Sequence, residues 1–188
     1  KPWQTDDSIG SWGYDVNKPY TTSDLQIDKF VDIVSKNGNL LLNVPIRADG
    51  TLDATATKIL EDIGGWLAVH GEGIYETRPW HYVGEGKVNE IPHFVEESPY
   101  TFRDVRYTAK GEDLYAFILK WPPKNKEYVE LALLAPGNIR IGNIVSVEML
   151  GYEGDLVWEQ HPDGLRVTFP EKRPTEFAHC LKIQFSDQ

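Results

Sequence analysis

The sequence predicts two regions of different fold class, an α/β region over residues 1–80 and an all-β region over residues 81–188. A short apolar strand with an amphipathic helix on each side indicates the first region. A series of short strands separated by turns indicates the second. Glycines and a proline interrupt residues 71–86, where the spacing of the apolar residues changes. We therefore expect two domains in this chain.

The strand of the α/β region lies in residues 38–50, GNLLLNVPIRADG. Its nearly continuous apolar run between a glycine and a proline is typical of a strand that helices cover on both faces. A single parallel strand cannot satisfy its own backbone hydrogen bonds, and no second strand of this type is visible in the sequence. We therefore expect residues 1–80 to be the end of an α/β domain whose earlier units lie outside this chain, which would make the chain a fragment.

Two amphipathic stripes predict the helices on either side of this strand. Ser23 and Gln26 have the spacing of a capping box at the start of the first helix, and Gly38 is expected to end it. Asp53 is the expected N-cap of the second helix, and Gly71 its terminator. The stripes consist of Ile27, Phe30, Val31 and Val34, and of Ile59, Leu60, Ile63, Trp66, Leu67 and His70.

Residues 1–20 are aromatic and polar and contain glycines and prolines, which predicts an irregular loop. A loop beside a buried strand is a common place for ligand contacts. Its aromatic residues Trp3, Trp12 and Tyr14 can equally plug the end of the domain. The composition of the loop leaves both interpretations open.

The second region reads as an antiparallel β-sandwich, because about seven or eight short strands alternate with turns. The Asp163-Gly164 pair predicts a tight hairpin between its flanking strands. The expected strands include residues 105–107, 114–121, 128–134, 144–150, 156–159, 165–169 and 178–185.

The charge and composition exclude several classes of partner and chemistry. A net charge of −10 and a pI of about 4.9 argue against binding to nucleic acid or to an anionic membrane. No apolar run approaches the roughly 20 residues that cross a bilayer. Cys180 is the only cysteine, and the histidines lack metal-ligand spacing, so we expect no disulfide, no metal and no cofactor.

Three motifs follow one another in the first 80 residues. They are WQTDDSIGSWGY at residues 3–14, DIVSKNGNLLLNVPIRADGTLD at residues 32–53 and GGWLAVHGEGIYETRPW at residues 64–80. In this order they resemble the C-terminal third of an α-L-fucosidase of glycoside hydrolase family 29. The β-rich remainder resembles the C-terminal sandwich of that family in its pattern.

The resemblance implies a (β/α)₈-like barrel followed by a β-sandwich. It also implies exo-acting hydrolysis of terminal α-L-fucose with retention, through a covalent intermediate on an Asp, with a Glu that usually serves as acid/base. Residues 38–50 would then form the last barrel strand and its following loop. The implied partners are a fucosylated glycan and the N-terminal part of the barrel, and the implied location is secreted or periplasmic.

The resemblance places no catalytic residue in this chain. The nucleophile of the family lies on an earlier strand, before the position of Lys1. Some members have a Glu acid/base directly after the Trp of the first motif, where this chain has Gln4. Because an amide has no proton to donate at useful pH, Gln4 cannot fill that role. We expect the chain alone to be inactive.

The resemblance gives Trp12 a substrate-binding role, in which its ring lines the fucose pocket near the methyl group of the sugar. A loop plug stays the alternative for Trp12. A second functional hypothesis is a carbohydrate-binding or interaction module in which the sandwich carries the binding site, and a third is a decayed hydrolase kept as a scaffold. The expected pocket supports are Trp3, Gln4, Tyr14, Asn43 and Arg47.

Overall fold

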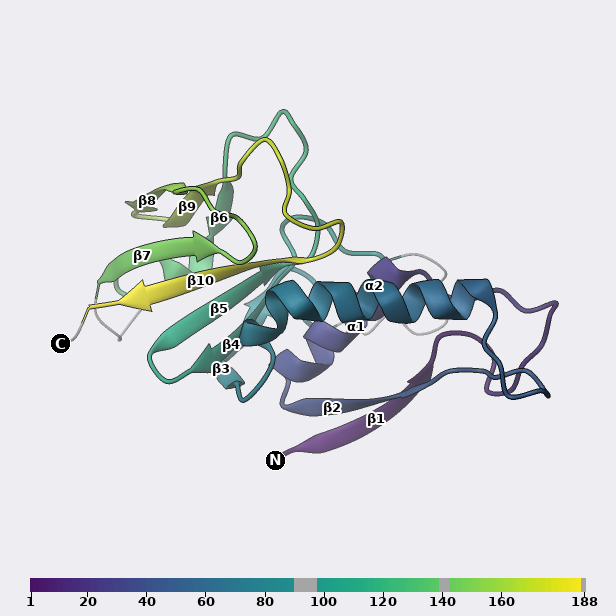
Figure 1. Cartoon of the computed structure of the whole chain (residues 1–188). Helices are drawn as coiled ribbons and strands as arrows, with labels where there is room; N and C mark the ends of the chain where they lie inside the picture. The colour runs from purple at the N-terminus through teal and green to yellow at the C-terminus, as the bar shows by residue number, and fades with distance from the viewer. Residues whose placement is uncertain (90–97, 139–142, 187–188) are drawn as a thin grey trace.

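The computed structural model describes residues 1–89, 98–138 and 143–186. Figure 1 shows a two-stranded sheet on one side of the helices and two larger sheets on the other. The strand β1 (Trp3–Ser8) leads through helix α1 (Ser23–Ser35) to strand β2 (Gly38–Asn43), and helix α2 (Ala54–His70) follows. The first region is therefore a β-α-β-α unit, as expected of an α/β domain.

β1 is a strand that the sequence did not predict. It pairs with β2 in parallel, from Trp3 beside Gly38 to Ser8 beside Asn43. Our expectations that residues 1–20 are loop throughout and that β2 has no partner strand in this chain are wrong. β1 was missed because alternate residues of WQTDDS point to an open face and are polar, so the strand lacks an apolar run.

The β1–β2 sheet has one covered face in the described residues. Leu42 packs on that face against Ala56 and Ile59 of α2. Leu41 points the other way and is 59% exposed, beside Asp6 of β1. The expectation that helices cover both faces of β2 therefore does not hold within the part of the chain that the structure describes.

The beginning of α1 differs from the predicted capping box. Thr22 is the N-cap, and its Oγ1 accepts a hydrogen bond from Leu25 N at 3.2 Å. Ser23 is the first helical residue and turns toward α2. The side chain of Gln26 donates to Thr21 Oγ1 at 2.8 Å instead of reaching back to a cap. Both Thr22 and Ser23 are suitable N-cap residues, but only Ser23 has a Gln three residues later, and for that reason the prediction chose the wrong one.

The other helix ends are close to those predicted. α1 ends at Ser35, and Asn37 adopts a φ of 66° before Gly38 begins β2. Asp53 caps α2 by accepting a hydrogen bond from Ala56 N, and Gly71 is the C-cap, both as predicted.

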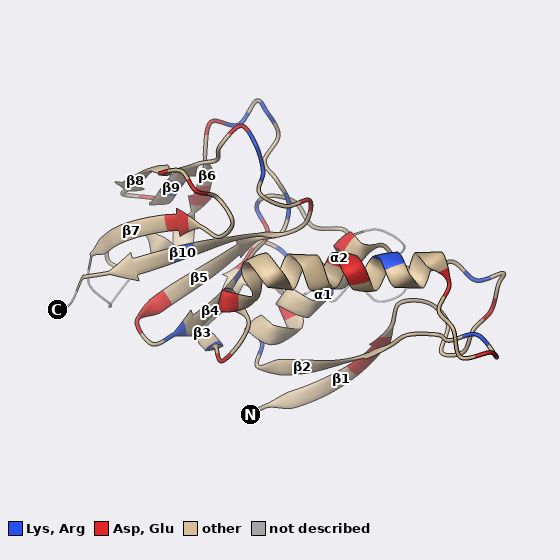
Figure 2. Ribbon diagram, in the orientation of Figure 1, with Lys and Arg blue, Asp and Glu red and all other residues tan. Residues whose placement is uncertain are grey.

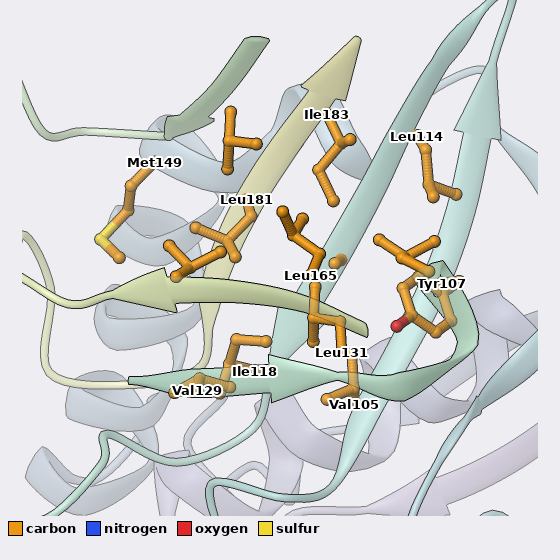
Figure 3. Packing of buried hydrophobic residues seen from close by; sticks show 14 residues of the cluster. Val105, Tyr107, Leu114, Ile118, Val129, Leu131, Met149, Leu165, Leu181 and Ile183 are labelled. Carbon is orange, nitrogen blue, oxygen red and sulfur yellow. The ribbon is translucent and has the colours of Figure 1, made fainter. Parts of the chain in front are cut away.

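The second region is a sandwich of two antiparallel sheets, as predicted. The five-stranded sheet has the order β3-β4-β5-β10-β7, and the three-stranded sheet the order β6-β9-β8. Their facing sides enclose a core that includes Leu131 and Leu165 of one sheet and Leu114, Ile118 and Leu181 of the other (Figure 3). The strands are β3 (Arg78–Glu85), β4 (Val105–Lys110), β5 (Asp113–Ile118), β6 (Val129–Leu131), β7 (Ile144–Met149), β8 (Val157–His161), β9 (Gly164–Thr168) and β10 (His179–Phe185), with short 3₁₀ helices at Gly71–Gly73 and Ala132–Leu134.

Two details of the sandwich refine the sequence analysis. The predicted hairpin between β8 and β9 is confirmed, but its two loop residues are Pro162 and Asp163, because Gly164 is the first residue of β9 and pairs with His161 of β8. β3 was missed, because Pro79 and Gly84 lie in it and its pairing with β4 shifts between them. β3 also begins before the expected domain boundary at residue 80.

The helices pack on the outer side of the five-stranded sheet. Ile27 of α1 and Trp66 of α2 share a buried cluster with Phe117 of β5 and Cys180 of β10. The indole Nε1 of Trp66 donates to the carbonyl of Ala178 at 2.7 Å. The α/β region and the sandwich are therefore joined by a common core, which holds β1 and β2 at a fixed distance from the sandwich.

Candidate functional site

Two loops meet at the C-terminal ends of β1 and β2. Residues 9–22 follow β1 and residues 44–53 follow β2, and both loops extend from the same end of the sheet (Figure 1). Ile9 N donates to the carbonyl of Asn43 at 3.2 Å and continues the pairing past the strands. These loops carry charges of both signs (Figure 2). The carboxyl ends of parallel strands are where α/β folds usually bind ligands.

Trp12 lies in the first loop, and its side chain is exposed. It is 64% exposed, which is unusual for a tryptophan. The described residues leave its side chain unburied. An exposed indole at the end of two parallel strands is available to stack on the apolar face of a ligand.

Asn43 connects the two loops from the last position of β2. Its Nδ2 lies 2.9 Å from Ser8 Oγ, 3.2 Å from the carbonyl oxygen of Trp12 and 3.5 Å from that of Ser11. The side chain is therefore directed at the backbone of the Trp12 loop. The structure brings the side chain of Asn43 to the backbone of Trp12.

Tyr14 and Arg47 form a second contact between the loops. The guanidinium carbon of Arg47 lies 5.7 Å from the centre of the Tyr14 ring, and its Nε lies 3.5 Å from the Tyr14 hydroxyl. The hydrogen bond with Tyr14 raises the pKa of Arg47 above its usual value, so Arg47 stays positively charged. These two residues give the site an aromatic ring with a fixed cation above it.

Tyr20 and Asp53 form a third contact, which the sequence analysis missed. The hydroxyl of Tyr20 donates to Asp53 Oδ2 at 2.9 Å, while Asp53 Oδ1 accepts from Ala56 N at 2.8 Å. Burial, followed by the hydrogen bond to the carboxylate, raises the pKa of Tyr20 to about 12. The backbone N–H of Ala56 lowers the pKa of Asp53. Asp53 was predicted as an N-cap, and a cap uses only one of its two carboxylate oxygens. The other oxygen needs a hydrogen-bond donor where it is sheltered from water, and this need was the signal for the contact.

Trp3 and Gln4 do not lie with these residues. They begin β1, and a six-residue strand is about 17 Å long, so the whole strand separates them from the Trp12 loop. The indole Nε1 of Trp3 donates to the carbonyl of Lys36 at 2.8 Å, after the end of α1. The structure therefore assigns Trp3 a packing contact at the opposite end of the sheet.

The chemistry of the strand-end loops suits binding. Asp49 accepts hydrogen bonds from Thr51, which lower its pKa and keep it ionised. Asp53 is occupied as a helix cap, and Asp15 accepts from Asn17 N at 2.9 Å. These carboxylates serve loop and helix-end geometry, so they are not arranged as a general acid and base.

Residues 1–89, 98–138 and 143–186 contain neither a metal-binding cluster nor a membrane-spanning helix. Within these ranges no group of three or more His, Cys, Asp or Glu side chains could hold a metal ion. Neither helix in these ranges has the length and apolar character needed to span a bilayer.

Comparisons with known families and proteins agree on one enzyme family. Residues 1–72 match the family described as Alpha-L-fucosidase, and residues 98–184 match the family described as Alpha-L-fucosidase C-terminal domain. The chain is 34% identical to tissue alpha-L-fucosidase of Bos taurus over 96% of its own length and 36% of the relative. It is 31% identical to plasma alpha-L-fucosidase of Homo sapiens over 86% of its length and 32% of the relative. The chain thus spans about a third of these curated relatives.

Solved structures show the same fold. Alpha-L-fucosidase isoenzyme 1 from Paenibacillus thiaminolyticus matches with a TM-score of 0.76 at 24% identity, covering 99% of this chain and 40% of that one. The Thermotoga maritima alpha-fucosidase in complex with fucose matches with a TM-score of 0.74 at 24% identity, covering 97% and 40%. The fold is therefore the C-terminal end of a (β/α)₈-like barrel followed by an antiparallel β-sandwich. The chain belongs to the α-L-fucosidase family, glycoside hydrolase family 29.

Proposed function

We propose that this chain is part of a retaining, exo-acting α-L-fucosidase, which hydrolyses terminal α-L-fucose from glycans. The observation that carries the proposal is the exposed Trp12 at the C-terminal end of two parallel strands, in a chain of this family. Catalytic residues of barrel enzymes lie at that end of the strands. The chain contributes one wall of the fucose pocket and the β-sandwich.

The catalytic carboxylates belong to the part of the enzyme that this chain does not span. Gln4 stands where some family members have an acid/base, and β1 holds it at the end of the sheet away from Trp12. Asp49 and Asp53 are occupied by turn and cap hydrogen bonds. Retaining hydrolysis needs a nucleophile and an acid/base about 5 Å apart, on either side of the scissile bond. The chain alone is therefore expected to be inactive.

Within the pocket, Trp12 is proposed to bind the sugar. Fucose presents an apolar patch of ring C–H groups and a methyl group, which an indole ring can cover. Tyr14, Arg47 and Asn43 support the loop that carries Trp12. The resemblance also suggested Trp3 and Gln4 as supports of the pocket. Both lie at the far end of β1, so any effect that they have on the pocket passes through this strand.

The test compares the 188 residues with the longer enzyme on a synthetic aryl α-L-fucoside. We expect release of the aryl group only with the longer enzyme. Robust hydrolysis by the 188 residues alone would show that catalytic carboxylates lie within them. Retention is tested by ¹H NMR of the first product, which should be the α-anomer of fucose.

The alternative of a carbohydrate-binding or interaction module has one observation in its favour. A groove of about 480 Å³ on the sandwich is lined by Trp121 and Phe169, with Lys124, Lys126 and Glu171 at its edge. We propose a domain boundary at residue 80. Under this alternative, residues 81–188 form a domain that binds a glycan without the barrel. Binding to a glycan array that Trp121→Ala abolishes would support it, and no binding together with fucosidase activity of the longer enzyme would decide against it.

A further inference from the structure

We propose that Asn43 and Ser8 form a clamp that sets the position of the Trp12 loop and thereby the face that Trp12 presents to the sugar. The two residues are the last of β2 and β1, and they are partners in the parallel register. The effect of the clamp on sugar binding rests on the proposed fucosidase function. Its geometry is given by the hydrogen bonds of the described residues.

The amide of Asn43 supplies the donors of the clamp. A side-chain NH₂ group has two N–H bonds. One is directed at Ser8 Oγ at 2.9 Å, and the other lies within reach of the carbonyl oxygens of Trp12 at 3.2 Å and Ser11 at 3.5 Å. The amide therefore contacts the loop backbone at Trp12 itself, which fixes where the side chain of that residue begins.

The hydroxyl of Ser8 is the other half of the clamp. Ser8 is buried, and its Oγ accepts from Asn43 Nδ2 and from Gly10 N at 3.3 Å. The hydroxyl donates its single proton to the carbonyl oxygen of Ser11, with 3.1 Å between the two oxygens, and the carbonyl oxygen of Asn43 lies farther away at 3.4 Å. One hydroxyl thus links Asn43 of β2 to the first turn of the loop, where it accepts from Gly10 N and donates to the carbonyl of Ser11. Together the two side chains hold residues 8–12 at several points.

The clamp matters because Trp12 has no core to position it. The indole is mostly exposed, so its direction depends on the backbone that carries it. A sugar-binding ring must be held within a fraction of an ångström of its productive position for binding and orientation to be efficient. Asn43 and Ser8 are therefore positioning residues that act through Trp12.

The test uses the intact enzyme labelled with 5-fluorotryptophan. The ¹⁹F resonance of Trp12 is identified by its loss in Trp12→Phe. The variant Asn43→Asp keeps the shape of the side chain but removes both N–H donors and places a carboxylate against two carbonyl groups. We expect the Trp12 resonance to shift or broaden, and KM for an aryl α-L-fucoside to rise about tenfold with a smaller change in kcat.

Asn39→Asp is the matched control. Asn39 lies on the same strand and donates its amide to the carbonyl of Trp3 at 3.4 Å, at the opposite end of the sheet. We expect this variant to leave the Trp12 resonance in place. Ser8→Ala is the second clamp variant and should move the Trp12 resonance in the same direction by a smaller amount. Asn43→Gln, which keeps the NH₂ group on a longer side chain, should restore part of the original signal.

The outcomes separate the clamp from the proposed function. An unchanged Trp12 resonance in folded Asn43→Asp and Ser8→Ala, checked by circular dichroism, overturns the clamp. A moved resonance with unchanged kinetics supports the clamp and contradicts the role of Trp12 in the fucose pocket. A resonance that moves equally in Asn39→Asp overturns the clamp, because the effect is then general to β2.

Discussion

The loops at the ends of β1 and β2 and the side of α1 that faces the sandwich differ in the contacts that hold them. The loops at the ends of β1 and β2 are exposed and joined by a few hydrogen bonds, such as the one from Asn43 to Trp12. The side of α1 that faces the sandwich is joined by buried charges, with Asp32 and Arg106 almost fully buried. The proposed binding surface is thus held by few hydrogen bonds, whereas the side of α1 that faces the sandwich, which we call the seam, is held by buried ion pairs.

The seam is built on a row of aspartates along α1. Asp24, Asp28 and Asp32 recur every four residues and so share one face of the helix. Lys120, at the end of β5, pairs with both Asp24 and Asp28. Asp32 accepts from Arg106 Nε at 2.5 Å on one oxygen and pairs with Lys36 at 2.7 Å on the other. Each carboxylate in the seam has a cation beside it, so the charges are compensated inside the protein.

The largest expected effect comes from breaking this seam. Arg106→Leu leaves Asp32 buried with only Lys36 as its cation and removes the guanidinium from the carbonyls of Val105 and Lys87. We expect a loss of about 3–5 kcal/mol in the free energy of unfolding, because a buried charge loses its partner. Denaturant unfolding followed by fluorescence measures the loss.

Arg166→Leu is the matched control for Arg106→Leu. Arg166 pairs through Nε with the carboxylate of Glu130 at 2.8 Å, as Arg106 does with Asp32. Each guanidinium also lies over a tyrosine ring, at 4.7 Å from Tyr128 for Arg166 and 5.1 Å from Tyr100 for Arg106. Its pair is partly exposed, and an exposed pair contributes about 0–1 kcal/mol. A loss in Arg106→Leu no greater than in Arg166→Leu would contradict the importance of the seam.

The second effect concerns acid and the buried histidines between α2 and β10. His70 and His179 have ring centres 6.4 Å apart, and within the described residues neither Nδ1 has a hydrogen-bond partner. Burial lowers the pKa of His70 to about 4 and, with the charges of Arg173 and Lys120 and the ring of His70, that of His179 to about 3. A histidine with a lowered pKa in the folded state stabilises it above its unfolded pKa of about 6.5, and this stability is lost as the pH falls.

Asp28 acts in the opposite direction over the same range. Burial raises its pKa to about 7 against the attraction of Lys120, with Asp24 adding to the rise and Ser98 hydrogen-bonded to it. Between pH 5 and 6 the folded protein therefore binds one proton at Asp28 that the unfolded chain does not, and lacks two at the histidines. The balance predicts that stability falls by about 1 kcal/mol for each unit of acidification in this range.

Two variants, one at Asp28 and one at His179, separate these opposing contributions. Asp28→Asn should roughly double the slope of stability against pH between pH 5 and 6, since only the histidines then titrate. His179→Gln should make the slope nearly flat. Chemical denaturation at several pH values measures both slopes. A slope that does not respond to either variant would show that other groups dominate acid sensitivity.

The third effect belongs to the strand-end loops and should be seen in binding. Trp12→Ala should change the free energy of unfolding by less than about 0.5 kcal/mol, because the side chain is mostly exposed. In the intact enzyme it should raise KM for an aryl α-L-fucoside about tenfold, which corresponds to about 1.4 kcal/mol. An unchanged kcat/KM would remove Trp12 from the fucose pocket.

Features that depend on neighbouring residues in the chain could be predicted from the sequence. The helix stripes, the Asp53 cap and the hairpin between β8 and β9 follow from spacing and turn residues. β1 was hidden because its open face is polar, and β3 because Pro79 interrupts it. The row of aspartates on α1 was visible at a spacing of four, but its burial depends on Lys120 and Arg106 from distant strands. The role of Trp12 came from resemblance alone.

The smallest effect concerns the contact between the loops at Tyr20 and Asp53. Tyr20→Phe removes the hydroxyl that donates to Asp53 Oδ2 and leaves the cap bond from Asp53 Oδ1 to Ala56 N in place. We expect a loss of about 1 kcal/mol in the free energy of unfolding, the usual net contribution of one hydrogen bond. The pKa of Asp53 should rise toward its usual value, because Tyr20 no longer donates to it. NMR titration of the Asp53 carboxyl measures that rise.

Tyr82→Phe is the control for this contact. Tyr82 is an exposed tyrosine whose hydroxyl makes no hydrogen bond within the described residues, so its loss should change stability by less than about 0.5 kcal/mol. Equal losses in the two variants would mean that the Tyr20 hydroxyl does not tie the loops together. A larger loss in Tyr20→Phe, still well below that of Arg106→Leu, would place this contact in the lightly held end of the molecule, where single hydrogen bonds decide the geometry of the loops.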